Sequence, residues 1–239
     1  MKKYNLVFEE NFDQSNQLNL ALWNYAIGEK WSNNEQQCYT DAKENLFIRD
    51  NQLHIIATLS EDTPCKYKSA RINTHNKKHF QYGKFVVRAK MPHGKGSWPA
   101  IWFLGTSIKE PHVRWPLCGE IDLVEFAGNK PGSVSSAIHT DTYNHKIKTH
   151  KGERILLPTA SNEFHNYELE WTETTLIFSV DGQSYMEIEK QASDTEKEWP
   201  FDQSYFLIIN LAVGGWYGGE IDDQTFPFEL VIDSIKVYQ

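Results

Sequence analysis

Short apolar or alternating runs, separated by turn residues, dominate this sequence of 239 residues. Strict alternation places successive side chains on opposite faces of a strand, and no segment carries the apolar spacing of a long amphipathic helix. A hairpin is predicted where the runs 46–48 and 53–57 flank Asp50-Asn51. Further strands are predicted at 85–89, 167–171, 176–180, 206–209 and 230–232. This pattern predicts an all-β fold, a jelly-roll β-sandwich of two antiparallel sheets with a concave cleft.

Composition limits the partners that such a chain can bind. It carries 32 acidic and 24 basic residues, a net charge of -8. This balance argues against nucleic acid, because phosphate binding needs an excess of Lys and Arg. No apolar run approaches the length needed to cross a membrane. A neutral partner such as a sugar suits this charge, and the 8 Trp, 11 Tyr and 13 Phe could either stack on sugar faces or fill a core.

The sequence gives weaker evidence on domain organisation and on cellular location. The sequence shows no linker and no repeat, so residues 1–239 are expected to form a single domain. Its three cysteines, Cys38, Cys65 and Cys118, lack zinc-site spacing and allow at most one disulfide. No hydrophobic leader follows Met1. A mature chain would therefore be secreted, whereas a complete gene product of this sequence would stay in the cytoplasm.

Three carboxylates stand in one otherwise apolar strand, at residues 119–126. Side chains alternate along a strand, so Glu120 and Asp122 share a face while Ile121 and Leu123 point the other way. Strict parity would turn Glu125 away from the other two acids. A one-residue bulge after Asp122 would return it to their face, and bulges are common beside active sites.

Two glutamates flanking an aspartate suit retaining glycoside hydrolysis. In that reaction one carboxylate attacks the anomeric carbon, and a second, with a raised pKa, protonates the leaving oxygen and later activates water. Clustered like charges disfavour ionisation, which keeps one acid protonated near neutral pH. The alternative is a solvated acidic face, which is costly because like charges on a strand repel one another.

The segment E-I-D-L-V-E resembles the signature of family-16 glycoside hydrolases, in the longer, bulged form that laminarinases carry. Other blocks of the family follow in the same order, among them N-N-E-x-Q-x-Y-T, S-A-R-I and G-x-G-x-W-P-A-x-W, and the resemblance covers nearly the whole chain. The matching segments lie at 31–40, 69–72, 82–92, 94–102, 119–126 and 210–215. One departure is Val86, where many members carry Glu.

This resemblance implies the roles of the three acids. Glu120 would be the nucleophile, Asp122 would orient and tune it, and Glu125 would be the general acid/base. The single domain is then catalytic and is expected to be a monomer that needs no cofactor for catalysis. The resemblance implies an endo-β-glucanase acting on β-1,3-glucan of the laminarin type.

Aromatic and polar residues are expected to line the concave substrate cleft. Tryptophans near the acidic strand in sequence are candidate stacking platforms, with core packing as the rival for each. By resemblance, an Asn and an Arg would supply hydrogen bonds to sugar hydroxyls, although the Arg could instead form a structural salt bridge. A His on the next strand could bind Asp122 or a hydroxyl near the cleaved bond. These candidates are Asn33, Arg71, Trp98, Trp102, Trp115, His139 and Trp216.

Other functions on the same jelly roll remain open. A non-catalytic β-glucan-binding module would have lost one or both glutamates, whereas here all three acids are present. A mixed-linkage β-1,3-1,4-glucanase is the nearest enzymatic alternative, although dedicated lichenases carry the shorter strand without a bulge. Agarases and carrageenases act on galactans, and sulfated galactans favour a more basic groove than a chain of this charge offers.

A structural cation is also expected, away from the acidic strand. Strand parity places Asp233 on the apolar face that carries Val231 and Ile235, where an unpaired acid is costly. Many members of the family hold one Ca²⁺ on the convex side. By resemblance its ligands would be the Asp233 side chain and main-chain carbonyls of Asn11 and Asn51. Oxygen ligands of this kind suit a hard cation.

Overall fold

Strands form nearly all the regular structure of the computed structural model, which describes residues 4–62 and 64–239. The helical segments are short: α1 (Gly215–Gly218), η1 (Thr106–Lys109), η2 (His145–Ile147) and η3 (Asp223–Thr225). The strands are β1 (Leu6–Glu10), β2 (Asn24–Tyr25), β3 (Gln37–Tyr39), β4 (Leu46–Arg49), β5 (Gln52–Leu59), β6 (Tyr67–Ser69), β7 (Arg71–Asn73), β8 (Gly83–Lys90), β9 (Ser97–Gly105), β10 (Glu120–Phe126), β11 (Ser133–His139), β12 (Lys151–Leu156), β13 (His165–Trp171), β14 (Thr175–Val180), β15 (Gln183–Glu189), β16 (Tyr205–Val213) and β17 (Phe228–Tyr238).

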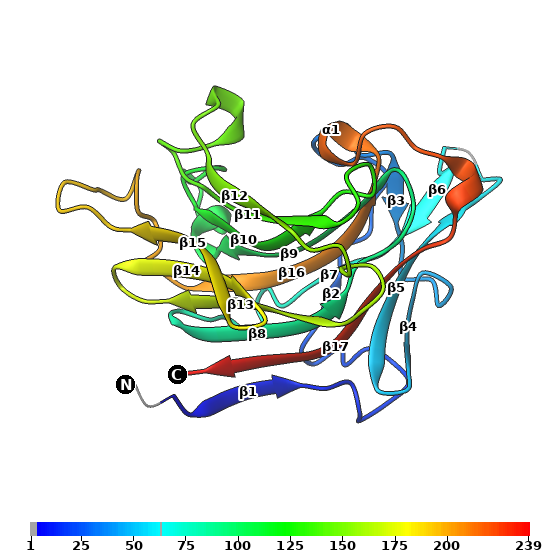
Figure 1. Ribbon diagram of the computed structural model, residues 1–239, viewed down its shortest axis with the longest axis horizontal. Coiled ribbons are helices and arrows are strands. Elements are labelled where there is room, and N and C mark those ends of the chain that lie inside the picture. The colour runs from blue at the N-terminus through cyan, green and yellow to red at the C-terminus, as the bar shows by residue number, and fades with distance from the viewer. Residues whose placement is uncertain (1–3, 63) are drawn as a thin grey trace.

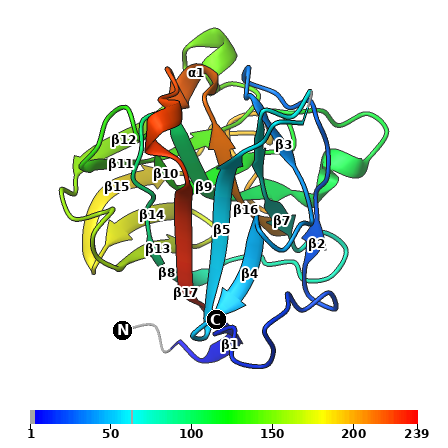
Figure 2. The ribbon, with the colours of Figure 1, turned by 90° about the vertical axis from the view of Figure 1, so that its right-hand side faces the viewer.

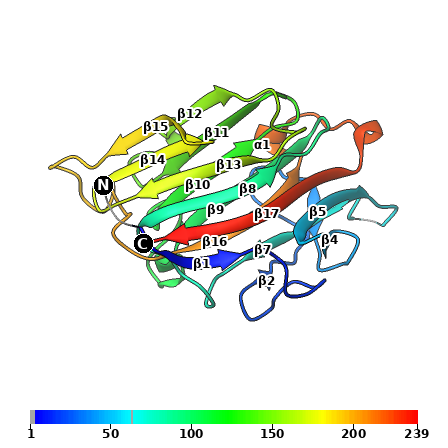
Figure 3. The same ribbon diagram turned by 60° about the horizontal axis from the view of Figure 1, so that its bottom comes forward.

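Two sheets pack face to face in a jelly-roll sandwich (Figure 1). The seven-stranded sheet has the order β12-β11-β10-β9-β16-β7-β2. The ten-stranded sheet has the order β15-β14-β13-β8-β17-β5-β6-β3, with β1 added beside β17 and β4 beside β5. Figure 3 shows its outer face, where β14, β13, β8, β17 and β1 lie side by side. The predicted all-β sandwich is confirmed.

The predicted hairpin is also confirmed, and a second hairpin closes in the same way. The β4–β5 hairpin closes through Asp50 and Asn51, which take φ values of 53° and 58°. The β14–β15 hairpin closes through Asp181 and Gly182, at 49° and 77°. Positive φ at both central residues is the tight turn whose twist matches antiparallel strands, and Asn, Asp and Gly tolerate it best. Figure 2 shows β5 beside β17, the next strand of the same sheet.

Alternating side chains fill the space between the sheets. On β8 the buried Phe85, Val87 and Ala89 alternate with half-buried residues. From the opposite sheet, Phe103 meets Phe85 with ring centroids 5.0 Å apart. Regular strands of this kind contribute every second residue to the core, and the residues between them point to the outer face of their sheet.

A bulge in β17 changes the predicted setting of Asp233. The register against β8 shifts between Ile232 and Ser234. Ile232 before the bulge and Ile235 after it both lie in the core, whereas Asp233 is half-buried. The prediction that Asp233 shares an apolar face with its neighbours was wrong, because the extra residue reverses the parity of the strand.

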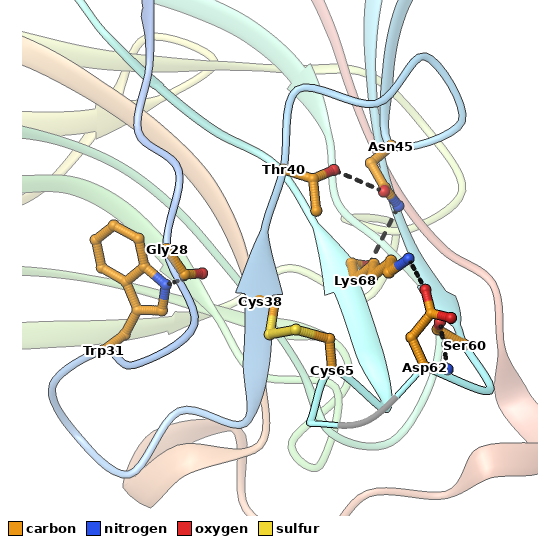
Figure 4. Close-up of a disulfide and its surroundings, with 9 residues drawn as sticks. All are labelled: Gly28, Trp31, Cys38, Thr40, Asn45, Ser60, Asp62, Cys65 and Lys68. Atoms are coloured by element: carbon orange, nitrogen blue, oxygen red, sulfur yellow. Dashed lines mark hydrogen bonds and ion pairs between the residues drawn. A yellow bond between two sulfur atoms is a disulfide. The ribbon is translucent and has the colours of Figure 1, made fainter.

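One disulfide ties strand β3 to the segment before β6. Cys38 and Cys65 are bonded, with 2.05 Å between the sulfur atoms (Figure 4). Beside them, the Asn45 side chain accepts from Thr40 Oγ1 at 3.0 Å and donates to the Lys68 carbonyl at 3.3 Å. Cys118 is a buried free thiol. The described residues contain no helix long and apolar enough to cross a membrane.

Candidate active site

The three acids of β10 lie on the outer face of the seven-stranded sheet. The register of β10 is irregular after Asp122 against both β9 and β11. As a result Leu123 and Val124, consecutive residues, both lie in the core. Glu125 is thereby returned to the face of Glu120, as the sequence predicted.

Burial changes the acidity of this trio. It raises the pKa of Glu120, Asp122 and Glu125, each to about 8. The negative charge of Asp122 raises the pKa of both glutamates further, while the His139 imidazole acts in the opposite direction. The three carboxyls cannot all ionise readily in such a setting, so at least one keeps its proton near neutral pH. The site therefore holds at least one proton donor near neutral pH.

Each glutamate accepts a hydrogen bond from a tryptophan. Trp115 Nε1 donates to Glu120 Oε2 at 2.9 Å, and Trp98 Nε1 donates to Glu125 Oε1 at 2.9 Å. An indole N–H can only donate, so each bond favours the ionised form of its glutamate and fixes its direction. The second oxygen of each carboxyl takes no part in these bonds.

His139 stands opposite Glu120 on the neighbouring strand β11. Its Nε2 lies 3.4 Å from Asp122 Oδ2 and 3.8 Å from Glu120 Oε1. The predicted position of this histidine beside the acids is confirmed. Its other ring nitrogen, Nδ1, is buried without a hydrogen-bond partner.

A second group of predicted residues lies on β7, β9 and β16, across the sheet from β11. The Arg71 guanidinium is 5.0 Å from the ring centroid of Trp102 and 5.0 Å from that of Trp31. Trp102 Nε1 donates to Asn210 Oδ1 at 2.8 Å, and Asn210 Nδ2 donates to the Tyr39 hydroxyl at 3.0 Å. These contacts with two rings fix the Arg71 side chain. Aromatic rings held in this way form the kind of platform that binds sugar faces.

Trp216 and Asn33 meet at the other wall of the cleft. The backbone N–H of Trp216 donates to the backbone carbonyl of Asn33 at 3.0 Å, and 53% of the Trp216 residue is exposed. Its ring lies 5.5 Å from that of Trp98. Trp98 itself is only 5% exposed. The expectation of a solvent-facing platform therefore holds for Trp216 but not for Trp98, whose ring is covered by its neighbours while its N–H reaches Glu125.

A model of glycosyl hydrolases family 16 matches residues 10–233. The chain belongs to this family. It is 38% identical over 244 residues to a beta-glucanase from Rhodothermus marinus, an alignment that covers 99% of this chain and 85% of that protein. The chain is therefore a glycoside hydrolase. The match to the family extends over nearly the whole sandwich and is not limited to the acidic strand.

Solved structures of family-16 enzymes share the fold closely. A laminarinase from Flavobacterium sp. UMI-01 superimposes with a TM-score of 0.91 at 40% identity, covering 98% of this chain and 100% of that one. A mutant of SCLam, described as a non-specific endo-beta-1,3(4)-glucanase, was co-crystallised with a glucan oligosaccharide. It superimposes with a TM-score of 0.94 at 34% identity, covering 100% of this chain and 96% of that one.

The predicted calcium ligands lie near one another, but the Asp233 carboxylate already has partners. Gln52 Nε2 donates to its Oδ1 at 3.1 Å, and Arg88 Nε lies 3.3 Å from its Oδ2. Glu10, at the end of β1, pairs with Ile235, which brings the segment of Asn11 to the same region. As arranged, this donor set does not fit a hard cation, because a guanidinium stands where the ion would bind.

Two further residues contact the predicted site residues but were not singled out from the sequence. Glu35 accepts from Gln37 Nε2 at 2.9 Å, and burial raises the pKa of its carboxyl while the nearby Arg71 charge lowers it. It belongs to the N-N-E block, which was a usable signal. His145 lies against Trp115, with ring centroids 5.0 Å apart. No sequence pattern marked it, because its position depends on the path of the loop between β11 and β12.

Proposed function

We propose that this chain is a retaining endo-β-1,3-glucanase that cleaves laminarin-type glucan by double displacement. The observation that carries this function is the bulged strand β10, which presents Glu120 and Glu125 on one face with Asp122 between them. A retaining glycosidase needs such a close pair of carboxyls, one as nucleophile and one as proton donor. The relatives named beta-glucanase and laminarinase support the substrate class.

Glu120 acts as the nucleophile and Glu125 as the general acid/base. The order in the family signature supports this assignment. The position of His139 supports it as well, because its Nε2 lies 3.8 Å from Glu120 Oε1 and the imidazole lowers the pKa of Glu120, which favours the carboxylate that attacks. Asp122, 3.4 Å from the same nitrogen, holds the imidazole and tunes Glu120 by its charge.

The proposed reaction has two steps. Glu120 attacks the anomeric carbon while Glu125 gives its proton to the leaving glycosidic oxygen, and a covalent glucosyl-enzyme forms. Glu125, now ionised, then takes a proton from water, which displaces Glu120 with overall retention. Arg71, Trp102 and Asn33 contact the glucan on one side of the cleaved bond.

Mixed-linkage β-1,3-1,4-glucan is the second candidate substrate. SCLam, whose fold matches closely, is described as a non-specific endo-beta-1,3(4)-glucanase. The bulged form of β10 favours laminarin as the first substrate.

Residues 1–239 form one catalytic domain that works as a monomer, with no nucleic acid or membrane as partner. The Cys38–Cys65 disulfide supports a location outside the reducing cytoplasm, because disulfides persist in oxidising compartments.

Hydrolysis of laminarin and barley β-glucan, followed side by side, tests the proposal. We expect internal cleavage of laminarin, with products that first appear as the β-anomer in a proton NMR time course. Glu120→Gln serves as the inactive control of matched shape. α-Anomeric first products would exclude retention, and binding of laminarin without any hydrolysis would indicate a glucan-binding module instead.

A further inference from the structure

The connection between β11 and β12, residues 140–150, is held in a defined shape. The buried Asn144 side chain donates to the carbonyls of Thr140 and Asp141, each at 3.1 Å. Thr142 Oγ1 donates to Glu198 Oε1 at 2.6 Å, which fastens the loop to a second segment. In Figure 1 this connection rises above the same face of the seven-stranded sheet as α1. The position of His145 at the tip is thus set by hydrogen bonds at the base of the loop.

The His145 ring contacts two tryptophans that lie on opposite sides of the predicted cleft. Its ring centroid lies 5.0 Å from that of Trp115 and 5.5 Å from that of Trp216. Trp115 binds Glu120, while Trp216 packs on Trp98, which binds Glu125. An unbroken series of contacts therefore runs from one glutamate to the other through the imidazole of His145.

The chemistry of this imidazole suits an uncharged ligand. Its Nδ1 is buried without a hydrogen-bond partner. Burial, with the nearby charges of His139, Lys146 and His150, lowers the pKa of His145 to about 4. A neutral ring can still donate to or accept from a sugar hydroxyl, and it has no charge that a neutral glucan would leave unpaired.

We propose that His145 is a specificity-determining residue that restricts the cleft, at the bond to be cut, to an unbranched glucan chain. This inference rests on the proposed glucanase function and deepens it. Sugars that stack on Trp115 or Trp216 share their space with His145, which contacts both rings. A glucosyl unit with a 6-O-linked branch is wider than the bare backbone, so it collides with the imidazole when it lies over the acids.

The test compares two substrates across matched variants. The substrates are a linear β-1,3-linked oligoglucoside and a β-1,3-glucan with single β-1,6-linked glucosyl branches. His145→Ala is expected to lower kcat/KM on the linear substrate about 2–5-fold through loss of one contact, and to raise the branched-to-linear ratio at least about 5-fold. His145→Phe, which keeps a ring in place, should keep the low ratio. His112→Ala, an exposed histidine of the β9–β10 connection, is the control and should leave the ratio unchanged.

The outcomes separate this inference from the proposed function. An unchanged ratio in a folded His145→Ala variant, checked by its melting temperature, would overturn the role of His145 while the glucanase function stood. Equal wild-type rates on the two substrates would also overturn it. A wild-type chain that cleaves neither substrate would refute the glucanase function itself.

Discussion

The carboxyl group of each active-site glutamate accepts a hydrogen bond from one indole N–H. These two bonds position the carboxyl groups but take no part in proton transfer. Trp115 and Trp98 both bond at 2.9 Å, yet they come from different segments, the β9–β10 connection and β9 itself. Neither indole can exchange a proton with its glutamate. The carboxyls and His139 are therefore the groups that can transfer a proton. We expect substitutions of the tryptophans and of the carboxyls to affect the kinetics in different ways.

Substitutions of the two glutamates should give opposite results with activated substrates. Glu120→Gln cannot form the covalent intermediate, so kcat should fall by roughly three orders of magnitude or more on every substrate. Glu125→Ala should keep most activity on aryl glycosides with good leaving groups, which depart without protonation, and added azide should trap a β-glycosyl azide. Peptide mapping after a 2-fluoroglucosyl inactivator should find the label on Glu120. A label on Glu125 would reverse the two roles.

The raised pKa values of the three acids predict that these acids destabilise the fold at alkaline pH. The pKa of Glu120 in the folded chain is about 8, above the ordinary value of 4.5. The folded state therefore holds a proton that the unfolded state has lost, and this stability, complete below about pH 4.5, is lost as pH rises through 8. Glu120→Gln should melt about 2–4 °C above the wild type at pH 8, the shift of a roughly 1 kcal/mol gain. The difference should vanish at pH 4.5, and a difference independent of pH would contradict the cause.

At the scale of strands, periodicity predicted most elements but not every bulge. The bulge of β10 was predictable because three acids in an apolar strand made strict parity implausible. The bulge of β17 was not, since Asp233 alone gave no sign of where parity would break. Its carboxylate lies by Arg88, an ion pair between neighbouring strands that are far apart in the sequence, so the local pattern does not contain it. The sequence likewise allowed one disulfide without indicating which cysteines form it.

Removal of the disulfide should loosen β3 and affect substrate binding. The bridge closes a loop of 27 residues, and the loop-entropy relation predicts a stabilisation of about 3.5 kcal/mol for a loop of this length. Strand β3 also carries Tyr39, which binds Asn210 and through it Trp102. Cys38→Ala with Cys65→Ala should therefore lower the melting temperature by several degrees and raise KM for laminarin more than it lowers kcat. Cys118→Ala, which breaks no bridge, is the control; equal effects on KM would argue against a role of β3.

At the scale of the whole molecule, the function depends on loops that lie together above one face of the sandwich. The hydrophobic pattern predicted two sheets, and the signature strand located the acids. The contacts of Trp216 with Asn33 and of His145 with Trp115 join segments far apart in the chain. Such contacts follow from loop paths, which depend on tertiary packing rather than on local periodicity. For this reason the positions of the three acids on one face were predictable to the residue, while the residues around them were predictable only as a set of candidate aromatics.

The opposite face of the molecule offers a decisive test of the predicted calcium site. Either a cation displaces Arg88 from Asp233 and binds there with the carbonyls of Asn11 and Asn51, or the ion pair itself joins β8 to β17. If calcium binds, a chelator should lower the melting temperature and added Ca²⁺ should restore it, by mass action on the folded state. Asp233→Ala should abolish that response while the variant still cleaves laminarin. The arrangement of Arg88 and Gln52 favours the ion pair, which predicts melting curves that do not respond to the chelator and an Arg88→Gln variant that melts lower by a few degrees. A calcium response that survives in Asp233→Ala would place the ion elsewhere in the chain.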